Sequence, residues 1–316
     1  MSISRTKLTV VGAGYVGSTC AQLAASKDLA SEVCLIDVVE GRPQGIALDL
    51  NQMAAVEGFA SRVTGTNDPA DTADSDVVIM TAGKPRTPGM SRSDLLVTNG
   101  RVICAVAEYI RDSSPDAIVI VVTNPLDSMV HLMRARTGFT ARKVVGMAGV
   151  LDSARLRYFA AEATGTAARD AEAMVLGAHG DSMVPLAEHM SVAGVALGSI
   201  LDAQKIDALS DRTRRGGAEI VGLLKTGSAW YAPAASAVSM AAAILRDEQR
   251  LMPTACLLNG QYGLEGLYMG VPAVLGATGV ESIVELPLAA EDRIQMQKTA
   301  GAISLDLETL REAGLL

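Results

Sequence analysis

Short apolar segments alternate with amphipathic segments along the first half of the chain. The apolar segments are rich in Val and Ile and lack alternating polar positions, as expected of parallel strands that are buried on both faces of a sheet. We expect strands at residues 7–11, 33–37, 77–81, 117–123 and 143–146, and helices at residues 16–26, 44–56, 94–112 and 126–137. Strand, helix and strand in repetition predict right-handed βαβ units and a doubly wound α/β fold with a parallel sheet.

The pattern changes near Gly149, where the regular alternation of strands and helices ends. Helices are expected at residues 152–164, 202–225, 232–247 and 289–313, and strands near residues 172–176, 191–195, 252–258 and 271–275. No repeat of solenoid length and no low-complexity linker interrupts the chain. We therefore predict a domain of residues 1–149, a mixed α/β domain of residues 150–316, and a broad interface between them.

Composition narrows the classes of partner. The 316 residues are 49% hydrophobic and 20% charged, with a formal net charge of −8 and 3% aromatic residues. Such a chain is not expected to bind nucleic acid or an anionic membrane, since both require a basic surface. The longest stretch of small apolar residues, 232–245, is too short to span a bilayer, and no secretory signal is visible. We expect a cytoplasmic location.

The cysteines and histidines predict no metal site. Four cysteines are scattered without a C-x-x-C pair, which is typical of reduced thiols in the cytosol. The three histidines are too few and too dispersed for a zinc site.

A glycine-rich turn follows the first expected strand and opens the first expected helix. Its G-x-G-x-x-G pattern comprises Gly12, Ala13, Gly14, Tyr15, Val16 and Gly17. The first glycine permits a tight turn, the second lets a pyrophosphate approach the backbone, and the third lets the helix pack close to the strand. The helix N-terminus also offers free N–H groups to the phosphates. The alternative is a turn with a purely structural role, but its position between strand and helix favours dinucleotide binding.

Asp37 ends the next expected strand, about 20 residues after the third glycine. A carboxylate there binds the adenosine ribose hydroxyls and repels a 2′-phosphate. We therefore predict NAD rather than NADP as the cofactor.

A loop with two arginines follows the third expected strand. Gly83, Pro85, Pro88 and Gly89 punctuate residues 82–92, which predicts a loop at the carboxyl end of a strand, where open α/β sheets bind ligands. Arg86 and Arg92 on this loop are candidates to clamp a carboxylate, because guanidinium groups pair with carboxylates bidentately. The alternative is a solvated basic loop.

Two further segments carry candidate acid–base chemistry. Asp152 and Arg155 share one face of an expected helix, although an ordinary surface pair has the same spacing. His179 lies between glycines after an apolar segment, which leaves room for a ligand beside the imidazole, although a histidine in a turn has the same setting. A histidine with a carboxylate partner beside a nicotinamide would make a dehydrogenase site.

Together these segments resemble the lactate/malate dehydrogenase family over nearly the whole chain. The similar positions are, in order, Ala82-Gly83, Arg86, Pro88-Gly89-Met90, Arg92, Thr123-Asn124-Pro125, Leu151-Asp152-Ser153, Arg155, Gly177 and His179-Gly180-Asp181. The resemblance implies a Rossmann doubly wound NAD-binding domain followed by a mixed α/β catalytic domain. It also implies that His179 is the proton donor and acceptor and that Asp152 orients its ring.

The resemblance further assigns substrate and cofactor contacts. Arg155 would hold the substrate's C1 carboxylate, Arg92 would close with the loop and polarise the carbonyl, and Asn124 would bond the substrate oxygen beside the nicotinamide. Val122 and Thr123 would line the cofactor site, and Asn99 is similar to a family position near the cofactor.

Arg86 separates two activities within the family. Lactate dehydrogenases typically carry an uncharged residue there and malate dehydrogenases an arginine, because a second buried carboxylate needs a cation and a methyl group beside an unpaired buried arginine is penalised. We therefore expect reversible oxidation of (S)-malate to oxaloacetate. The sequence of residues 227–234 is similar to that of lactate-dehydrogenase-like malate dehydrogenases of bacteria, and this resemblance implies a homotetramer or a dimer. Trp230 departs from it, because tyrosine or a similar residue is expected at that position.

Three other functions remain as alternatives. A lactate or other 2-hydroxyacid dehydrogenase would use the same scaffold, but Arg86 disfavours it. An NAD-dependent glycosidase would need a metal site, which the sparse histidines disfavour. A non-catalytic NAD-binding sensor would need neither the loop arginines nor an aspartate–histidine pair.

Overall fold

The computed structural model of the chain describes residues 6–85 and 91–316. One large sheet contains nine strands: β1 (Lys7–Val11), β2 (Glu32–Ile36), β3 (Arg62–Thr66), β4 (Val77–Met80), β5 (Ile118–Val121), β6 (Val144–Gly146), β12 (Arg250–Asn259), β13 (Glu265–Gly276) and β14 (Gly279–Ile283). Their spatial order is β14-β13-β12-β6-β5-β4-β1-β2-β3. The strands β1 to β6 pair in parallel, and β12 to β14 extend the sheet with antiparallel pairing.

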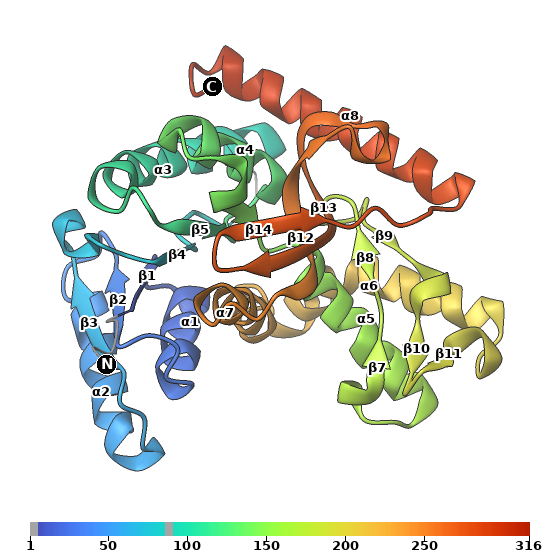
Figure 1. Cartoon of the computed structure of the whole chain (residues 1–316), viewed down its shortest axis with the longest axis horizontal. Helices are drawn as coiled ribbons and strands as arrows, with labels where there is room; N and C mark the ends of the chain where they lie inside the picture. The colour runs from blue at the N-terminus through green and yellow to red at the C-terminus, as the bar shows by residue number, and fades with distance from the viewer. Residues whose placement is uncertain (1–5, 86–90) are drawn as a thin grey trace.

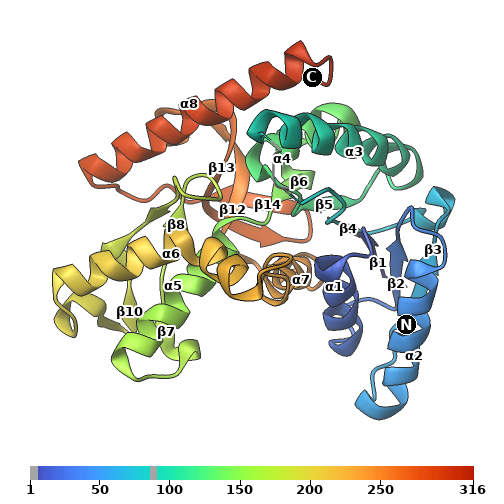
Figure 2. The same cartoon turned by 180° about the vertical axis from the view of Figure 1, so that it is seen from behind.

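Helices cover both faces of this sheet. Among the described residues, the α-helices are α1 (Tyr15–Ser26), α2 (Arg42–Glu57), α3 (Arg92–Ser113), α4 (Leu126–Thr137), α5 (Gly149–Thr164), α6 (Ala203–Leu224), α7 (Tyr231–Leu245) and α8 (Ala290–Glu312). Helices α3 and α4 lie on one face with α8 against them, and α1 packs against α7 on the other (Figure 1). Figure 2 shows the same layers from behind, with α8 again over α3 and α4.

Buried strands and capped helices follow from the sequence pattern. Every residue of β4 and β5 is buried, because these central strands have helices on both sides. Helix α3 begins with a capping box, in which the Ser91 hydroxyl accepts the Asp94 N–H and the Asp94 carboxylate accepts the Ser91 N–H. Helix α6 begins with the Asp202 carboxylate accepting the Lys205 N–H.

A smaller lobe contains the remaining short strands. They form one sheet of β7 (Ala171–Glu172), β10 (Ser191–Val192) and β11 (Val195–Ala196), and another of β8 (Val175–Leu176) and β9 (Val184–Pro185). Short 3-10 helices lie at Pro69–Thr72, Ala141–Lys143, Ala168–Asp170, Ala187–His189, Leu197–Ser199 and Gln261–Gly263. Helices α5 and α6 pack on each other beside this lobe.

The structure confirms the α/β fold class and corrects several elements. The expected strand at 172–176 is two strands in two sheets, and the one near 191–195 is a hairpin that turns at Ala193 and Gly194, both with positive φ. The strand β3 was missed because its Arg-Val-Thr-Gly-Thr sequence, at the sheet edge, has neither an apolar run nor strict alternation. The strand β14 was missed for the same reason.

The large sheet crosses the expected boundary near Gly149. Strands β12 to β14 come from the second half of the chain, yet β12 pairs with β6 through Ala255 and Gly146. The order β3-β2-β1-β4-β5-β6 reverses direction between β1 and β4, and the carboxyl ends of strands at such a point form a crevice that binds ligands. Within the described residues, no helix combines the length and apolar character that a membrane span requires.

Candidate active site

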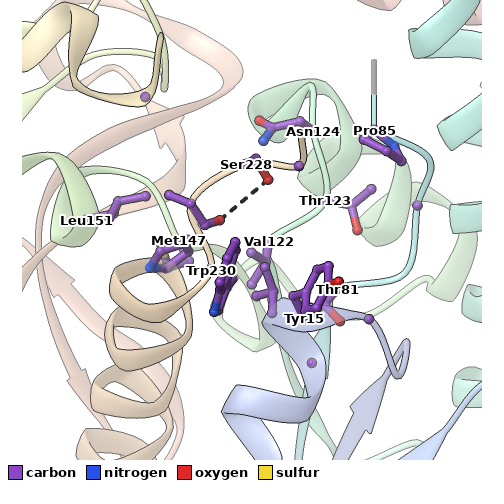
Figure 3. Close-up of a pocket in the computed structure, with 18 of the residues that line it drawn as sticks. Tyr15, Thr81, Pro85, Val122, Thr123, Asn124, Met147, Leu151, Ser228 and Trp230 are labelled. Carbon is purple, nitrogen blue, oxygen red and sulfur yellow. Dashed lines mark hydrogen bonds between the residues drawn. The ribbon is translucent and has the colours of Figure 1, made fainter. Parts of the chain in front are cut away.

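A cleft of about 520 Å³ opens at the carboxyl ends of the parallel strands. It is bounded by the glycine turn before α1, by the segments after β4 and β5, by α5 and α6, and by the segment that leads into α7. Figure 3 shows Tyr15, Thr81, Val122, Thr123, Asn124 and Trp230 around this space. The fold thus brings both halves of the chain to one site.

The glycine turn has the geometry that a dinucleotide phosphate requires. Gly12 has φ +101°, and a Cβ there would lie 2.8 Å from the Ala82 nitrogen. A Cβ on Gly17 would overlap the Gly12 carbonyl oxygen, so only glycine lets α1 pack this closely. At Gly14 a Cβ would meet nothing within 4 Å, and Gly14 lines the cleft. The open space at Gly14, next to the first N–H groups of α1, fits a pyrophosphate.

Two charged side chains flank the Ala13 peptide. The Asp37 carboxylate accepts the Ala13 N–H at 2.6 Å and the Val39 N–H at 2.9 Å. The Arg42 Nε donates to the Ala13 carbonyl at 2.8 Å. Asp37 therefore lies beside the glycine turn at the end of β2, although it is not among the described residues that line the cleft. Arg42 was missed, because nothing in the sequence distinguishes it from a solvated arginine at a helix start.

The strand ends β4 and β5 form the next wall of the cleft. Val122, Thr123 and Asn124 line it directly. Asn99 is buried and ties the two segments together, since its Oδ1 accepts the Lys84 N–H at 2.8 Å and its Nδ2 donates to the Asn124 carbonyl at 2.7 Å. These contacts bring the predicted cofactor residues together, and through them Asn99 links the two segments that form this wall of the cleft.

His179, Asp152 and Arg155 form a largely buried cluster beside the cleft. The His179 Nδ1 lies 2.9 Å from Asp152 Oδ2, and Arg155 Nη1 lies 3.2 Å from Asp152 Oδ1. The Asp152 side chain is 2% exposed, so the pair is not the ordinary surface pair that its spacing allowed. His179 and Arg155 line the cleft, whereas Asp152 lies behind them. This arrangement leaves the second ring nitrogen of His179 for a reacting group.

The carboxylate of Asp152 opposes the effect of burial on the pKa of His179. Burial lowers this pKa, whereas the charge and hydrogen bond of Asp152 raise it. The charge of Arg155 also lowers it, and that of Asp127 makes a smaller raising contribution. The net result is a pKa above the ordinary value of histidine. The ring therefore carries a proton more readily near neutral pH than a free imidazole does.

Two glycines of α6 make room for Arg155. A Cβ on Gly216 would lie 3.1 Å from Arg155 Cδ, and one on Gly217 would lie 3.6 Å from Nη2. The Arg155 side chain is 12% exposed, and its buried Nε has no hydrogen-bond partner among the described residues. These glycines were missed, because a glycine pair within a helical pattern has no specific meaning in a single sequence.

The two loop arginines differ from the rest of the predicted site. Arg86 lies outside the described residues. Arg92 is the first residue of α3, and its Nη2 lies 2.9 Å from Asp306 Oδ2 on α8. Arg92 is 65% exposed and is not among the described residues that line the cleft. The structure thus brings His179, Asp152, Arg155 and Asn124 together at the cleft. It pairs Arg92, at the start of α3, with Asp306 of α8 instead.

Trp230, the unexpected residue, stacks on the glycine turn. Its ring centroid lies 5.0 Å from that of Tyr15, with 28° between the planes, and both side chains line the cleft. The stack joins the start of α1 to the segment before α7 and forms an apolar wall. Among residues 6–85 and 91–316, no group of three or more His, Cys, Asp or Glu side chains is placed to hold a metal ion.

Comparisons with known proteins agree with the site. Residues 6–146 match the lactate/malate dehydrogenase NAD binding domain, and residues 149–313 match the lactate/malate dehydrogenase alpha/beta C-terminal domain. The malate dehydrogenase of Roseiflexus castenholzii is 49% identical over 308 residues, covering 98% of this chain and 99% of that protein. Malate dehydrogenase 1 of Anaeromyxobacter dehalogenans is 52% identical over 301 residues, covering 95% and 96%.

Solved structures of both activities are similar to this chain. The malate dehydrogenase of Salinibacter ruber has a TM-score of 0.93 and 44% identity, covering 98% of this chain and all (100%) of that one. The lactate dehydrogenase of Cryptosporidium parvum, solved with lactic acid and nicotinamide adenine dinucleotide, has a TM-score of 0.94 and 42% identity, covering 98% and 99%. Because both domain families match in order along nearly its whole length, the chain belongs to the lactate/malate dehydrogenase family and has its NAD-binding domain, as the motifs predicted.

Proposed function

We propose that this chain is an NAD-dependent malate dehydrogenase, which interconverts (S)-malate and oxaloacetate. The observation that carries the proposal is the largely buried cluster of His179, Asp152 and Arg155, which opens into the same cleft as the glycine turn. Acid–base, anion-binding and dinucleotide-binding groups therefore share one space. The curated relatives at 49% and 52% identity are malate dehydrogenases, which supports the choice of substrate.

The first half of the chain would hold the cofactor. Gly12 to Gly17 would receive the pyrophosphate, Asp37 the adenosine ribose, and Asn99 and residues 122–124 the nicotinamide end. When bound there, NAD accepts or returns a hydride at its nicotinamide ring. The carboxylate of Asp37 disfavours a 2′-phosphate, which supports NAD over NADP.

His179 would move the proton. In the oxidative direction its free ring nitrogen takes the proton from the malate hydroxyl, and in the reductive direction it returns that proton to the carbonyl oxygen of oxaloacetate. Asp152 accepts from Nδ1 at 2.9 Å, which fixes the ring and stabilises its charged form. The raised pKa of His179 favours the reductive role at neutral pH.

The arginines would hold the dicarboxylate. Arg155 would bind one carboxylate with its remaining guanidinium N–H groups, and Asn124 would donate to the substrate oxygen. Arg86 would bind the second carboxylate. Arg92 would leave Asp306 and approach the carbonyl, where its charge stabilises negative charge that develops on the oxygen.

Lactate dehydrogenase is the second candidate, because the scaffold serves both activities. The Cryptosporidium parvum lactate dehydrogenase has a TM-score of 0.94, no lower than that of the Salinibacter ruber malate dehydrogenase at 0.93. The choice therefore depends on Arg86, whose charge would be unpaired beside the methyl group of pyruvate.

The test is NADH oxidation with oxaloacetate and with pyruvate, side by side, at neutral pH. We expect rapid oxidation with oxaloacetate and little with pyruvate. A preference for pyruvate would overturn the substrate assignment but keep the site. If the protein binds NADH but oxidises it with neither substrate, the proposed enzyme function would be wrong and an NAD-binding sensor would be the better assignment.

We further propose a homo-oligomer, tetramer or dimer, in the cytoplasm, with a domain boundary near Gly149. Exposed apolar side chains support the oligomer, including Leu48 and Val56 on α2 and Leu223 on α6. The cytoplasm is supported by the four free cysteines. Light scattering after size exclusion would test the oligomer, and a monomeric mass would contradict it.

A further inference from the structure

A second carboxylate lies next to the catalytic histidine. Asp127 is in the first turn of α4, and its side chain is buried, with 5% of the residue exposed. Its Oδ2 accepts the backbone N–H of His179 at 3.2 Å. Its Oδ1 is buried and has no hydrogen-bond partner among the described residues. The proposed mechanism uses Asp152 and leaves Asp127 without a role.

The contact fixes a turn that needs support. His179 lies between Gly177 and Gly180, which have φ values of +84° and +130°. Gly177 is tied to Gly270 of β13 by two backbone hydrogen bonds of 2.9 Å. The bond from the His179 N–H to Asp127 ties the other side of the turn to α4. The imidazole is therefore held through its main chain by Asp127 and through its ring by Asp152.

Hydrogen bonding alone does not explain why this residue is an aspartate. One accepted N–H bond can equally be made to a neutral amide oxygen, whereas a buried carboxylate with an unpaired oxygen carries a cost of desolvation. A nearby positive charge offsets such a cost. His179 provides that charge only while its ring is protonated. The start of α4 also favours a negative charge in its first turn.

We propose that Asp127 is a positioning residue that holds the main chain of His179 and favours the protonated state of its ring. This role goes beyond the proposed acid–base function of His179 and rests on it. The reacting atoms would touch His179 and not Asp127. The ionised Asp127 and the protonated His179 stabilise each other, so the charge state of one follows that of the other.

The titration behaviour of Asp127 agrees with this role. Burial raises the pKa of its carboxyl to about 7, even though the charge and backbone N–H of His179 act to lower it. The carboxyl of Asp127 therefore changes charge near neutral pH. The other charged groups that act on His179 are Asp152 and Arg155 of α5. Arg214 of α6 and Asp292 of α8 line a separate cleft beside β9.

The test compares Asp127→Asn with the unaltered enzyme over a range of pH. The amide oxygen of asparagine still accepts the His179 N–H, so only the charge is removed. We expect the alkaline limb of kcat/KM for oxaloacetate and the acid limb for malate both to move to lower pH. At a pH on the alkaline limb, oxaloacetate reduction should fall roughly three- to tenfold, while the plateau changes little.

Asp28→Asn is the matched control. The Asp28 carboxylate also accepts backbone N–H groups, of Ala60 at 2.8 Å and Ser61 at 2.9 Å, but it lies at the end of α1, away from His179. Its variant should keep both limbs in place. Asp127→Ala, which removes charge and acceptor together, should lower kcat at every pH as well. Unmoved limbs in Asp127→Asn would overturn the proposal and leave Asp127 a purely structural acceptor.

A second measurement covers the case in which Asp127→Asn does not fold. The infrared absorption of protonated carboxyl groups is followed against pH in the unaltered enzyme and in His179→Asn. Loss of the histidine charge should raise the pH at which a buried carboxyl ionises, and an identical titration in both proteins would contradict the coupling. Full activity of His179→Asn would instead refute the proposed function, so the two failures are distinguishable.

Discussion

Arg92 is bound to Asp306, with 2.9 Å between Nη2 and Oδ2, so the arginine proposed to polarise the substrate carbonyl is held by the C-terminal helix. Asp306 is 14% exposed and also accepts from the Ser128 hydroxyl at 3.3 Å, which fixes it against α4. If Arg92 must leave this partner to reach the substrate, the ion pair favours the state in which the site is incomplete.

Asp306→Asn should therefore lower KM for oxaloacetate. The Arg92 side chain is 65% exposed, and exposed ion pairs contribute about 0–1 kcal/mol, which sets the change at up to about fivefold. Steady-state kinetics at low ionic strength would measure it. Asp112→Asn is the control: it breaks the Arg111–Asp112 pair on α3, the helix that carries Arg92, and should leave KM unchanged. A higher KM in Asp306→Asn would mean that the pair supports the productive state.

Asp152→Asn should move the pH profile in a defined direction. Burial lowers the pKa of His179, but Asp152 raises it by charge and hydrogen bond, and the balance lies above the ordinary value. Oxaloacetate reduction needs the protonated ring and malate oxidation the neutral one. Without Asp152, the pKa of His179 falls, so the alkaline limb of oxaloacetate reduction and the acid limb of malate oxidation should both move to lower pH.

The same variant should also lose turnover. Loss of ring orientation should lower kcat by about 10²–10⁴-fold, the scale of general acid–base catalysis. Profiles of both directions from pH 5 to 10 would show the shift (roughly the range in which histidine and its coupled groups titrate). If neither limb moved, Asp152 would not set the charge of His179.

Local pattern was enough to predict the first half of the fold, except for the edge strand β3. The strands β1, β2, β4, β5 and β6 are apolar runs between helices, and burial on both faces of a parallel sheet leaves that trace in the sequence. The pairing that adds β12 to β14 to this sheet leaves no such pattern in the sequence. It depends on the approach of Ala255 to Gly146, a pairing between distant segments that neither segment encodes alone.

The site divides in the same way. The glycine turn was predictable because its spacing and its place between strand and helix are local properties. The meeting of His179 with Asp152 was expected only from the resemblance to the family, because residue spacing does not show that two separate segments fold together. In the structure, Asp127 holds one side of the His179 turn and Gly270 the other. The ion pair of Arg92 with Asp306 joins α3 to α8, which are distant in the sequence, so no local spacing reveals it.

Arg86→Gln should change the choice of substrate. Removing one partner of a buried ion pair costs about 3–5 kcal/mol, so the kcat/KM ratio of oxaloacetate to pyruvate should fall by about 10²–10⁴-fold. Arg101→Gln, at an exposed position of α3, is the control and should keep the ratio. Competition assays with both substrates would measure it. An unchanged ratio would remove Arg86 from the substrate site.

Asp37 and Arg42 should act in opposite directions on cofactor choice. Both contact the Ala13 peptide, at 2.6 Å and 2.8 Å, beside the expected adenosine ribose. Asp37→Ala should weaken the binding of NADH. It should also reduce the ratio of NADH affinity to NADPH affinity by about 10–100-fold, the scale of a hydrogen bond to a charged group. Arg42→Ala should raise that ratio, because a cation near a 2′-phosphate is lost. Equal changes for both cofactors in either variant would contradict this.

Gly216→Ala should disturb substrate binding from outside the cleft. The new Cβ would lie 3.1 Å from Arg155 Cδ, so the arginine must shift to accommodate it. Displacement of a substrate-positioning group by about 1 Å costs up to about 10²-fold in rate. The shift needed here is a few tenths of an ångström, so kcat/KM for oxaloacetate should fall by about 2–10-fold. Gly222→Ala is the matched control on the same helix, because its Cβ would meet nothing within 4 Å.

Both glycine variants replace a helical glycine with a better helix former and should gain about 0.5–1 kcal/mol of helix stability. Thermal unfolding therefore separates the two effects. Gly222→Ala should raise Tm and keep kcat/KM, whereas Gly216→Ala should lose kcat/KM whatever its Tm. If the two variants behaved alike in both measurements, α6 would not determine the position of Arg155, and the glycine pair would have no part in the site.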